Sequence, residues 1–265
     1  MFNLNIDPVL ISLGSLQIRY YGLVFVIGFI VALYALKNAV RNKILDIEEE
    51  KTYDFIFYLL IGIIIGARMF HVIFWGFDYY FSNPLKILYV WQGGLSFHGG
   101  LAGAFVVTTY FSKKFKISFW KLADIISVVG ALMLGFGRIA NLINQEILGT
   151  ITNKPWCVKF LRADPDNCRH PVQIYAAIGI FGLFFILLKL KKYKDGFVFW
   201  NFVFLTGLGR FFLDFIREDI RYFGLSAGQW LSLIMIIIGF FTLVKYYKED
   251  LKLLFKLGEK KAAGN

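Results

Sequence analysis

The chain has 265 residues, of which 58% are hydrophobic and only 18% are charged. Average globular proteins have about 45–50% apolar and about 25% charged residues. A water-soluble fold of this size has no interior large enough for so much apolar surface, which here includes 30 Phe, 14 Tyr and 6 Trp. The composition excludes an ordinary soluble domain, a disordered chain and a disulfide-stapled miniprotein. It indicates an integral membrane protein, in which the net charge of +11 reports on membrane orientation rather than on nucleic-acid binding.

Seven segments are long and apolar enough to form membrane-spanning helices. A helix needs about 20 mostly apolar residues to cross the hydrocarbon core of a bilayer, and none of the seven segments contains a proline. We expect the helices at about 21–37, 53–73, 95–111, 119–138, 172–189, 197–215 and 228–246. The sequence therefore predicts an all-α integral membrane protein that forms a single polytopic domain over residues 1–265, with a long outward loop at 139–171.

Basic residues are concentrated around every second connection between these helices. The connections after the first, third and fifth helices, together with the chain from Lys245 onward, hold 18 of the 29 Lys and Arg residues. Because short loops rich in positive charge stay in the cytoplasm, we predict an outward N-terminus and a cytoplasmic C-terminus. Within the basic tail, 247–265, the segment 249–261 is predicted to be an amphipathic helix on the inner leaflet.

The polar residues that remain gather at the predicted outer ends of the helices. They include three arginines and all three histidines: Arg68, Arg138, Arg210, His71, His98 and His170. An arginine within a membrane span is costly and usually marks a functional site, and guanidinium groups are suited to binding phosphate. Three arginines at one depth predict a phospholipid headgroup site. The alternative is that each arginine reaches the interface or pairs with an acid such as Asp214 or Glu146.

Glycines surround His98 at the start of the third predicted helix, within the segment 93–103. Glycine lets a ligand approach the backbone closely, and a histidine with a pKa near 6.5 can exchange a proton at neutral pH. The segment therefore predicts a site that involves His98, Gly99 and Gly100. Ordinary helix packing through small residues, and a structural hydrogen-bonding role for His98, are the alternatives.

A second polar segment runs from Gly137 to Gly149. Arg138, Asn141 and Asn144 recur at every third position, so on a helix they share one face. A cation, two amides and the acid Glu146 at the membrane edge make a polar cradle rather than a packing surface.

These two segments resemble the bacterial prolipoprotein diacylglyceryl transferases. That family has a Gly-Arg-x-(Gly/Ala)-Asn-Phe-x-Asn-x-Glu-x-x-Gly signature, which residues 137–149 match except at Leu142. The segments 98–100, 19–22 and 169–175 are also similar to the family. Two departures are acidic positions: the family more often has Glu where this chain has Asp214 and Ala176.

The resemblance implies a transfer reaction at the outer face of the inner membrane. The diacylglyceryl group of phosphatidylglycerol passes to the lipobox cysteine of a prolipoprotein, leaving a thioether and glycerol 1-phosphate. The expected partners are phosphatidylglycerol, prolipoprotein signal peptides and membrane lipids, and no nucleic acid. The sequence shows no metal-ligand cluster and no nucleotide-binding glycine loop, so we expect no cofactor and no metal.

This chemistry suggests roles for the residues of the two segments. Arginines suit an anionic headgroup and the charge that grows on the departing oxygen, and His98 is the candidate base for the substrate thiol, unless neighbouring arginines make a base unnecessary. The expected assignments are phosphate binding by Arg138 and Arg210, positioning of the glycerol or ester oxygens by Asn141, Asn144 and Tyr21, orientation of Arg138 or a glycerol hydroxyl by Glu146, close approach at Gly99 and Gly100, and supporting positions for Arg68, His71, Asp214 and His170.

Two further questions stay open from the sequence. Cys157 and Cys168 lie in the outward loop, where a disulfide between them is a hypothesis. An anion transporter or channel is the main rival function, although the inner halves of the predicted helices are nearly all apolar. Another lipid-modifying enzyme is a second rival, with Ser96 beside His98 as its only suggestive pair.

Overall fold

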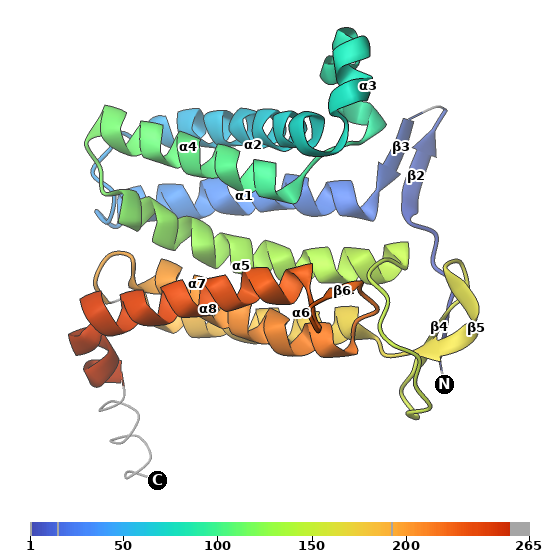
Figure 1. Ribbon diagram of the computed structural model, residues 1–265. Coiled ribbons are helices and arrows are strands. Elements are labelled where there is room, and N and C mark those ends of the chain that lie inside the picture. The colour runs from blue at the N-terminus through green and yellow to red at the C-terminus, as the bar shows by residue number, and fades with distance from the viewer. Residues whose placement is uncertain (1, 15, 192, 255–265) are drawn as a thin grey trace. The chain divides into compact units, whose positions relative to one another are not determined.

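The computed structural model describes residues 2–14, 16–191 and 193–254. Most of these residues are helical (Figure 1). The α-helices are α1 (Tyr20–Arg41), α2 (Lys51–Trp75), α3 (Phe77–Ser82), α4 (Phe97–Phe115), α5 (Phe119–Asn144), α6 (Val172–Lys189), α7 (Phe197–Leu213) and α8 (Ala227–Tyr246). The 3-10 helices are η1 (Pro84–Leu88), η2 (Val90–Gln92) and η3 (Asp214–Ile216).

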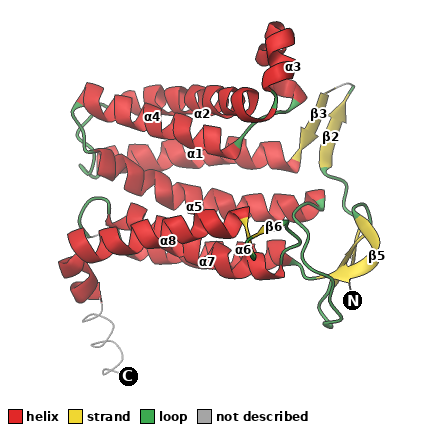
Figure 2. Ribbon diagram, viewed as in Figure 1, coloured by secondary structure: helices red, strands yellow, loops and turns green. Residues whose placement is uncertain are grey.

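Short strands lie in the connections, which the all-α prediction did not include (Figure 2). They are β1 (Phe2–Leu4), β2 (Val9–Leu13), β3 (Leu16–Arg19), β4 (Val158–Phe160), β5 (Asp164–Arg169), β6 (Arg221–Tyr222) and β7 (Leu225–Ser226). β1 pairs in parallel with β4, which pairs antiparallel with β5. β2–β3 and β6–β7 are antiparallel hairpins.

Within the described residues, six helices are long and apolar enough to cross a membrane: α1, α2, α5, α6, α7 with η3, and α8. This confirms a mostly helical protein of the integral membrane class. The third predicted span forms α4, which is not among the six because its sequence begins with glycines and ends with lysines. Seven spans, like the orientation of the termini, therefore stay a prediction. α5 continues to Asn144, beyond its expected end at 138, so the polar cradle is helical.

The chain forms two compact units, which we describe separately. The first comprises Met1–Gly28 and Ile126–Asn265, and the second comprises Phe29–Ile125. The single-domain organisation stays a prediction. In the first unit, the apolar core lies among α5, α6, α7 and α8, around buried Phe197 and Leu187. Residues 248–254 of the tail are helical, and Leu251 packs against this core. The rest of the predicted amphipathic helix, 255–261, lies outside the described residues.

In the second unit, α2 and α4 pack backbone against backbone. A Cβ atom added to Gly66 would lie under 3.0 Å from the Gly99 carbonyl oxygen, and one added to Gly103 would lie equally close to the Gly62 carbonyl. Real Cβ atoms essentially never come that near, so only glycine fits. Small residues allow this close approach of membrane helices, and Gly99 therefore has a packing role.

Candidate active site

The last turns of α5 carry a connected row of polar side chains. Arg138 Nη1 donates a hydrogen bond to Asn141 Oδ1 at 3.3 Å. Asn141 Nδ2 and Asn144 Nδ2 donate to the two carboxylate oxygens of Glu146, at 3.2 and 2.8 Å. Glu146 therefore orients both amides and is linked to Arg138 through Asn141, and orientation of a glycerol hydroxyl by Glu146 stays a prediction.

The chain reversal beyond α5 explains how Glu146 reaches its partners. Gln145 and Ile147 both have positive φ angles, 57° and 58°, so the backbone turns back over the helix end. The Glu146 amide then donates to the Asn141 carbonyl at 3.0 Å. Gln173 at the start of α6 donates to the Glu146 carbonyl at 2.6 Å, which fixes the reversal from a second helix.

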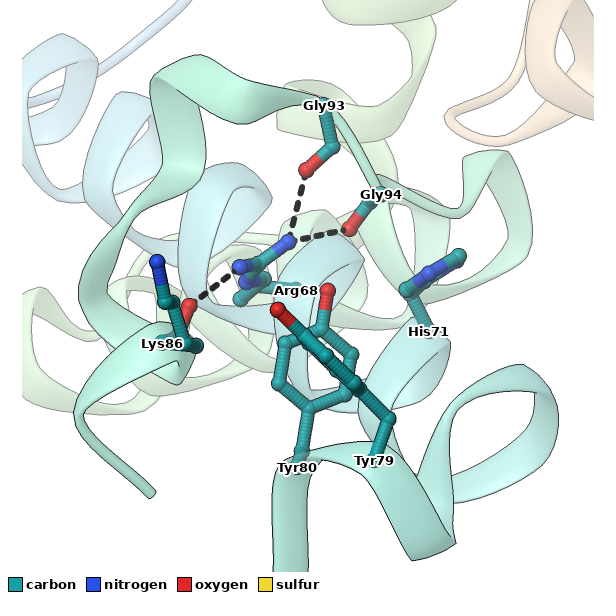
Figure 3. Close-up of a pocket in the computed structure, with 7 residues that line it drawn as sticks. All are labelled: Arg68, His71, Tyr79, Tyr80, Lys86, Gly93 and Gly94. Atoms are coloured by element: carbon teal, nitrogen blue, oxygen red, sulfur yellow. Dashed lines mark hydrogen bonds between the residues drawn. The ribbon is translucent and has the colours of Figure 1, made fainter. Parts of the chain in front are cut away.

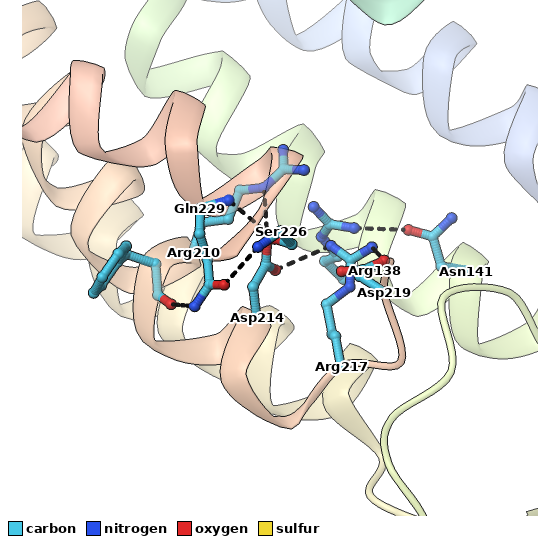
Figure 4. Close-up of polar contacts among 9 residues, drawn as sticks. Arg138, Asn141, Arg210, Asp214, Arg217, Asp219, Ser226 and Gln229 are labelled. Atoms are coloured by element: carbon cyan, nitrogen blue, oxygen red, sulfur yellow. Dashed lines mark hydrogen bonds and ion pairs between the residues drawn. The ribbon is translucent and has the colours of Figure 1, made fainter. Parts of the chain in front are cut away.

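A second cluster lies where α7 ends, around the buried carboxylate of Asp214, which is 1% exposed (Figure 4). Asp214 pairs with Arg210 Nε at 3.6 Å and with Arg217 Nη1 at 3.1 Å. The Ser226 hydroxyl donates to the same carboxylate at 3.3 Å. Arg217 also pairs with Asp219 at 3.0 Å. The alternative of arginine–acid pairing is thus realised for Arg210.

The two clusters belong to one site. Arg138 interacts electrostatically with Arg210, Arg217, Tyr21 and Asp214, and Figure 4 shows the three guanidinium groups gathered around Asp214. Among the described residues, no carboxylate lies within ion-pair distance of Arg138. Its charge is therefore left for a ligand.

Several polar atoms at this site are buried without a hydrogen-bond partner in the part of the chain that the structure describes. They are Arg210 Nε, Arg217 Nε, Asn144 Oδ1 and Gln173 Oε1. Buried polar groups are nearly always hydrogen-bonded in folded proteins, and each exception needs an explanation. Unsatisfied donors and acceptors beside three guanidinium groups suit an anionic, hydroxyl-bearing ligand.

Arg169 connects the two segments that carry the arginines of the site, 137–149 with Arg138 and 210–218 with Arg210 and Arg217. Its buried guanidinium donates to the Gly149 carbonyl at 2.9 Å, pairs with Glu218 at 2.6 Å and also pairs with Asp164. The segment 148–152 lies between 216–218 and 168–170: the Thr150 amide donates to the Ile216 carbonyl, and the His170 amide to the Thr150 carbonyl. The hydrogen bond from Arg169 also holds the pKa of Asp164 below its ordinary value.

Cys157 and Cys168 form a disulfide, with Cα atoms 5.5 Å apart, as hypothesised from their place in the outward loop. The bond closes the β4–β5 hairpin next to Arg169. The His170 ring contacts the Tyr175 hydroxyl through Nδ1 at 3.3 Å, and its expected role in supporting the site stays a prediction. Trp156 Nε1 donates to the same hydroxyl at 2.7 Å.

Arg68 belongs to the second unit, and its guanidinium binds backbone rather than an acid or an open space (Figure 3). Its donors reach five carbonyl oxygens, those of Lys86, Ile87, Tyr89, Gly93 and Gly94. The third arginine beside Arg138 and Arg210 is therefore Arg217, whereas Arg68 fastens the loop that leads into α4. A cavity of about 300 Å³ next to it is lined by His71, Tyr79 and Lys86, among others.

His98 is the second residue of α4 and is exposed, with its ring 6.4 Å from that of Phe70. A Cβ atom added to Gly100 would touch the Ile63 side chain of α2 at 3.4 Å. Gly99 and Gly100 thus face the neighbouring helix, which is the packing alternative. Tyr21 opens α1 and is 38% exposed. Ligand contact by these residues stays a prediction.

A comparison with known protein families decides the identity. The family model for prolipoprotein diacylglyceryl transferase matches residues 8–245 of the chain. The chain belongs to the prolipoprotein diacylglyceryl transferase family. A phosphatidylglycerol–prolipoprotein diacylglyceryl transferase of Geobacter sulfurreducens is 39% identical over 243 residues, 89% of this chain and 93% of that protein. One of the same name from Vibrio cholerae is 38% identical over 258 residues, 93% and 94% of the two chains.

The geometry explains why the diacylglyceryl transferase signature ends in a glycine here. A Cβ atom added to Gly149 would lie under 3.0 Å from the His170 carbonyl oxygen and 2.9 Å from Val172 Cγ1. The same residue gives its own carbonyl to Arg169. Sequence reasoning missed two features of this candidate site: the presence of Arg217, and the contacts by which Arg169 bridges the two segments. The charged residues 217–219, close after the sixth predicted span, were the signal that could have identified Arg217.

Proposed function

We propose that this chain transfers the diacylglyceryl group of phosphatidylglycerol to the lipobox cysteine of prolipoproteins, the first step of lipoprotein maturation. The observation that carries the proposal is the group of three guanidiniums around Asp214, with unsatisfied donors, in a member of the diacylglyceryl transferase family. Such a group suits the phosphate of a lipid headgroup. The names of the related proteins in Geobacter and Vibrio support the same two substrates.

The reaction is a substitution at the carbon of the diacylglyceryl group that is bonded to the phosphate oxygen. The thiolate sulfur forms a bond to this carbon while the carbon–oxygen bond breaks. The electron pair stays on the phosphate oxygen, which leaves as glycerol 1-phosphate, and the thiol proton passes to a base. The phosphate gains negative charge as it departs, so preorganised cations next to it stabilise the transition state.

Arg138 and Arg210 are proposed to bind the phosphate, with Arg217 adding positive charge through the shared Asp214. This division follows from the contacts among the described residues: Arg138 has no acid partner within ion-pair distance, and Arg210 pairs with one acid and is 40% exposed, whereas Arg217 pairs with two acids and is 15% exposed. Asp214 holds Arg210 and Arg217 in place, as a supporting residue.

The amides of Asn141 and Asn144 are proposed to position the glycerol or ester oxygens, together with Tyr21. Glu146 accepts one hydrogen bond from each amide and so sets which atoms face the substrate. Asn144 Oδ1 is left buried without a partner, so it is available to a glycerol hydroxyl donor.

His98 is proposed as the base that takes the thiol proton. Arg68 supports it by holding the carbonyls of Gly93 and Gly94, directly before α4. The substitution His98→Gln removes the base while keeping a polar side chain. Full activity of this variant at pH 7 would exclude His98 as an essential base.

We further propose seven spans in the bacterial inner membrane, with the N-terminus and the active site on the outer face and the C-terminus in the cytoplasm. The distribution of lysine and arginine supports this orientation. Alkaline phosphatase fused after Lys194 should be inactive in cells, and one fused after Lys154 should be active. The opposite pattern would reverse the orientation.

The activity is tested with purified protein in detergent, phosphatidylglycerol and a short lipobox peptide, read by mass spectrometry. A diacylglyceryl mass on the peptide cysteine is expected from the unaltered protein and not from Arg138→Ala. Arg162→Ala is the matched control, because Arg162 is an exposed arginine in the same outward region whose ion pair is with Asp7. Absence of the adduct with the unaltered protein would refute the proposal and favour a transport function.

A further inference from the structure

The cavity beside Arg68 in the second unit is positively charged. The Arg68 guanidinium is buried, and its hydrogen bonds go to backbone carbonyl oxygens. Over residues 68–112, Lys86 is the other positively charged side chain and Asp78 is the one acid. In the described part of the chain, neither Arg68 nor Lys86 lies within ion-pair distance of a carboxylate. Buried charges are normally paired with an opposite charge, so the carbonyls satisfy the donors of Arg68 but leave its charge unmatched.

Four more side chains with polar groups line this cavity: His71, Tyr79, Tyr80 and Lys86. Within the residues that the structure describes, none of these four side chains makes a hydrogen bond. Figure 3 shows both tyrosine hydroxyl groups turned toward the Arg68 guanidinium, which lies 4.8 Å from the ring centre of Tyr80. The cavity therefore offers ammonium, hydroxyl and imidazole groups to a ligand.

The wall of the cavity opposite the tyrosines is fixed by close contacts with α2. Gly94 has a φ angle of 71°, and a Cβ atom added to it would lie 2.7 Å from Arg68 Nη1 and 2.9 Å from His71 Nε2. The Gly94 carbonyl accepts a hydrogen bond from Arg68 at 3.0 Å, and the Ser96 amide donates to the Ala67 carbonyl at 2.9 Å. The chain thus passes directly beside both basic side chains, and the cavity is a fixed feature of the unit.

We propose that this cavity is a second phosphate-binding site of the protein, in addition to the site proposed around Asp214. A phosphate group supplies the negative charge that Arg68 and Lys86 lack, and its oxygens accept hydrogen bonds from ammonium, hydroxyl and imidazole donors. The volume of about 300 Å³ is at the lower end of small-molecule pockets, which suits a phosphate group and the atoms next to it. The phosphate belongs to a lipid headgroup or to a free phosphate ester, since both present the same oxygens.

The contacts assign different roles to the two cations. Nε, Nη1 and Nη2 of Arg68 are all engaged by carbonyl oxygens, so Arg68 acts on the ligand through its charge. Lys86 brings both a charge and donors that are not engaged. Arg68 holds the backbone carbonyl of Lys86 at 2.6 Å and not its side chain. The substitution Lys86→Gln therefore removes the ammonium group from the cavity and leaves the hydrogen bonds of Arg68 in place.

His71 can report on this cavity directly, because the chain has only three histidines. The full-length protein is labelled with carbon-13 at histidine Cε1 and studied by NMR in dodecyl maltoside, a detergent without phosphate. The spectrum of His71→Gln assigns the signal. The probes are inorganic phosphate, glycerol 1-phosphate and dihexanoyl phosphatidylglycerol, with dihexanoyl phosphatidylcholine as the lipid whose headgroup has no net charge.

Three variants are compared with the unaltered protein. Lys86→Gln removes the proposed ligand, and Lys113→Gln is the matched control, because Lys113 is an exposed lysine near the other end of α4 in the same unit. Arg138→Ala removes an arginine of the site around Asp214. The His71 signal should move saturably with at least one phosphate probe. The apparent Kd should rise several-fold in Lys86→Gln and stay unchanged in Lys113→Gln and Arg138→Ala.

The probes also separate the two sources of phosphate. Saturation by inorganic phosphate or glycerol 1-phosphate would support a site for free phosphate esters, whereas saturation by phosphatidylglycerol alone would support a headgroup site. A signal that moves with none of the probes would overturn the proposal. Equal affinity for phosphatidylcholine would overturn it as well, because net charge would then not be recognised.

Two results with the variants would also contradict a second site. An unchanged Kd in Lys86→Gln would mean that the phosphate binds elsewhere, and loss of the response in Arg138→Ala would mean that it acts from the site around Asp214. The signals of His98 and His170 show whether each variant is folded. Should Lys86→Gln not fold, Tyr79→Phe removes a hydroxyl donor from the same cavity and should weaken binding in the same way. The experiment measures binding alone, so its outcome does not depend on the transfer reaction.

Discussion

Gly228 in the first turn of α8 sets the space that Asp214 and Arg210 occupy. A Cβ atom at this position would lie 2.9 Å from Arg210 Nη2 and nearer still to Asp214 Oδ2, whereas ordinary contact begins at 3.4 Å. Asp214 is 1% exposed and is held by Arg217 and Ser226, so it has little room to move. Because the added Cβ atom lies nearest to Asp214 Oδ2, Gly228→Ala must displace this carboxylate, and the Arg210 guanidinium, which is 40% exposed and pairs with it at 3.6 Å, must shift with it.

Two effects of opposite sign act on stability. Overpacking costs about 1–3 kcal/mol, and replacing a helical glycine by alanine returns about 1 kcal/mol. The net effect is a loss of about 0–2 kcal/mol, so we expect an unchanged or modestly lower melting temperature. The rate responds more strongly, since a misplacement of about 1 Å in a catalytic group can cost on the order of 100-fold. We expect diacylglyceryl transfer by Gly228→Ala to fall about 10- to 100-fold.

The matched control is Gly209→Ala, beside Arg210 on α7, where an added Cβ atom meets nothing within 4 Å. This variant should keep the normal rate and the normal melting temperature or a slightly higher one. The assay compares kcat/KM for phosphatidylglycerol with a lipobox peptide, alongside melting in detergent. A folded Gly228→Ala protein with unaltered kcat/KM would show that the position of the Asp214–Arg210 pair does not govern the reaction.

Three further predictions concern the segment 145–171, between α5 and α6. Arg169→Met should lower transfer at least several-fold, because it frees both arginine-bearing segments, whereas Arg162→Met should not; equal rates in the same peptide assay would refute the bridging role. Gly149→Ala should destabilise the protein by about 1–3 kcal/mol through overpacking, seen as a lower melting temperature, and an unchanged value would contradict the close contact. Because Arg169 lowers the pKa of Asp164, the stabilisation from this pair is complete above the unfolded pKa of about 3.9 and is lost as the pH falls through the lower folded value. Acid melting of Asp164→Asn should therefore lack that component.

The long helices could be predicted from the sequence, because six of them in the described part of the chain are apolar runs of bilayer length. Their ends were less well placed, since α5 continues through polar residues to Asn144. Hydropathy reports only how apolar a segment is. The last turn of α5 is polar and is held by hydrogen bonds that Asn141 and Asn144 donate to Glu146, which lies in the chain reversal after the helix. The shared face of Arg138, Asn141 and Asn144 was predicted correctly, because spacing along a helix fixes direction.

The arginines show where sequence reasoning ends. Arg68, Arg138 and Arg210 share a predicted depth, but depth does not say what a side chain meets within the membrane plane. Arg68 meets carbonyls 18 to 26 residues away, in η1 and in the chain on either side of η2, which no periodic pattern predicts. Arg217 lies in a charged run after α7, and only its ion pair with Asp214 showed that it belongs to the candidate site. The glycines near His98 fit both ligand approach and helix packing; the position of α2 shows the packing, and ligand contact stays a prediction.

The arrangement of charges favours the transition state over the bound lipid. In phosphatidylglycerol the phosphate is a diester with one negative charge, and breaking the carbon–oxygen bond moves it toward a monoester with nearly two. A cation without a carboxylate partner gains more from this change than one whose charge is already matched. Arg138 is that cation, and its orientation is set through Asn141 by a carboxylate it does not touch. Interactions that strengthen only as the reaction proceeds accelerate it, and we therefore propose that the indirect link between Glu146 and Arg138 serves catalysis as well as structure.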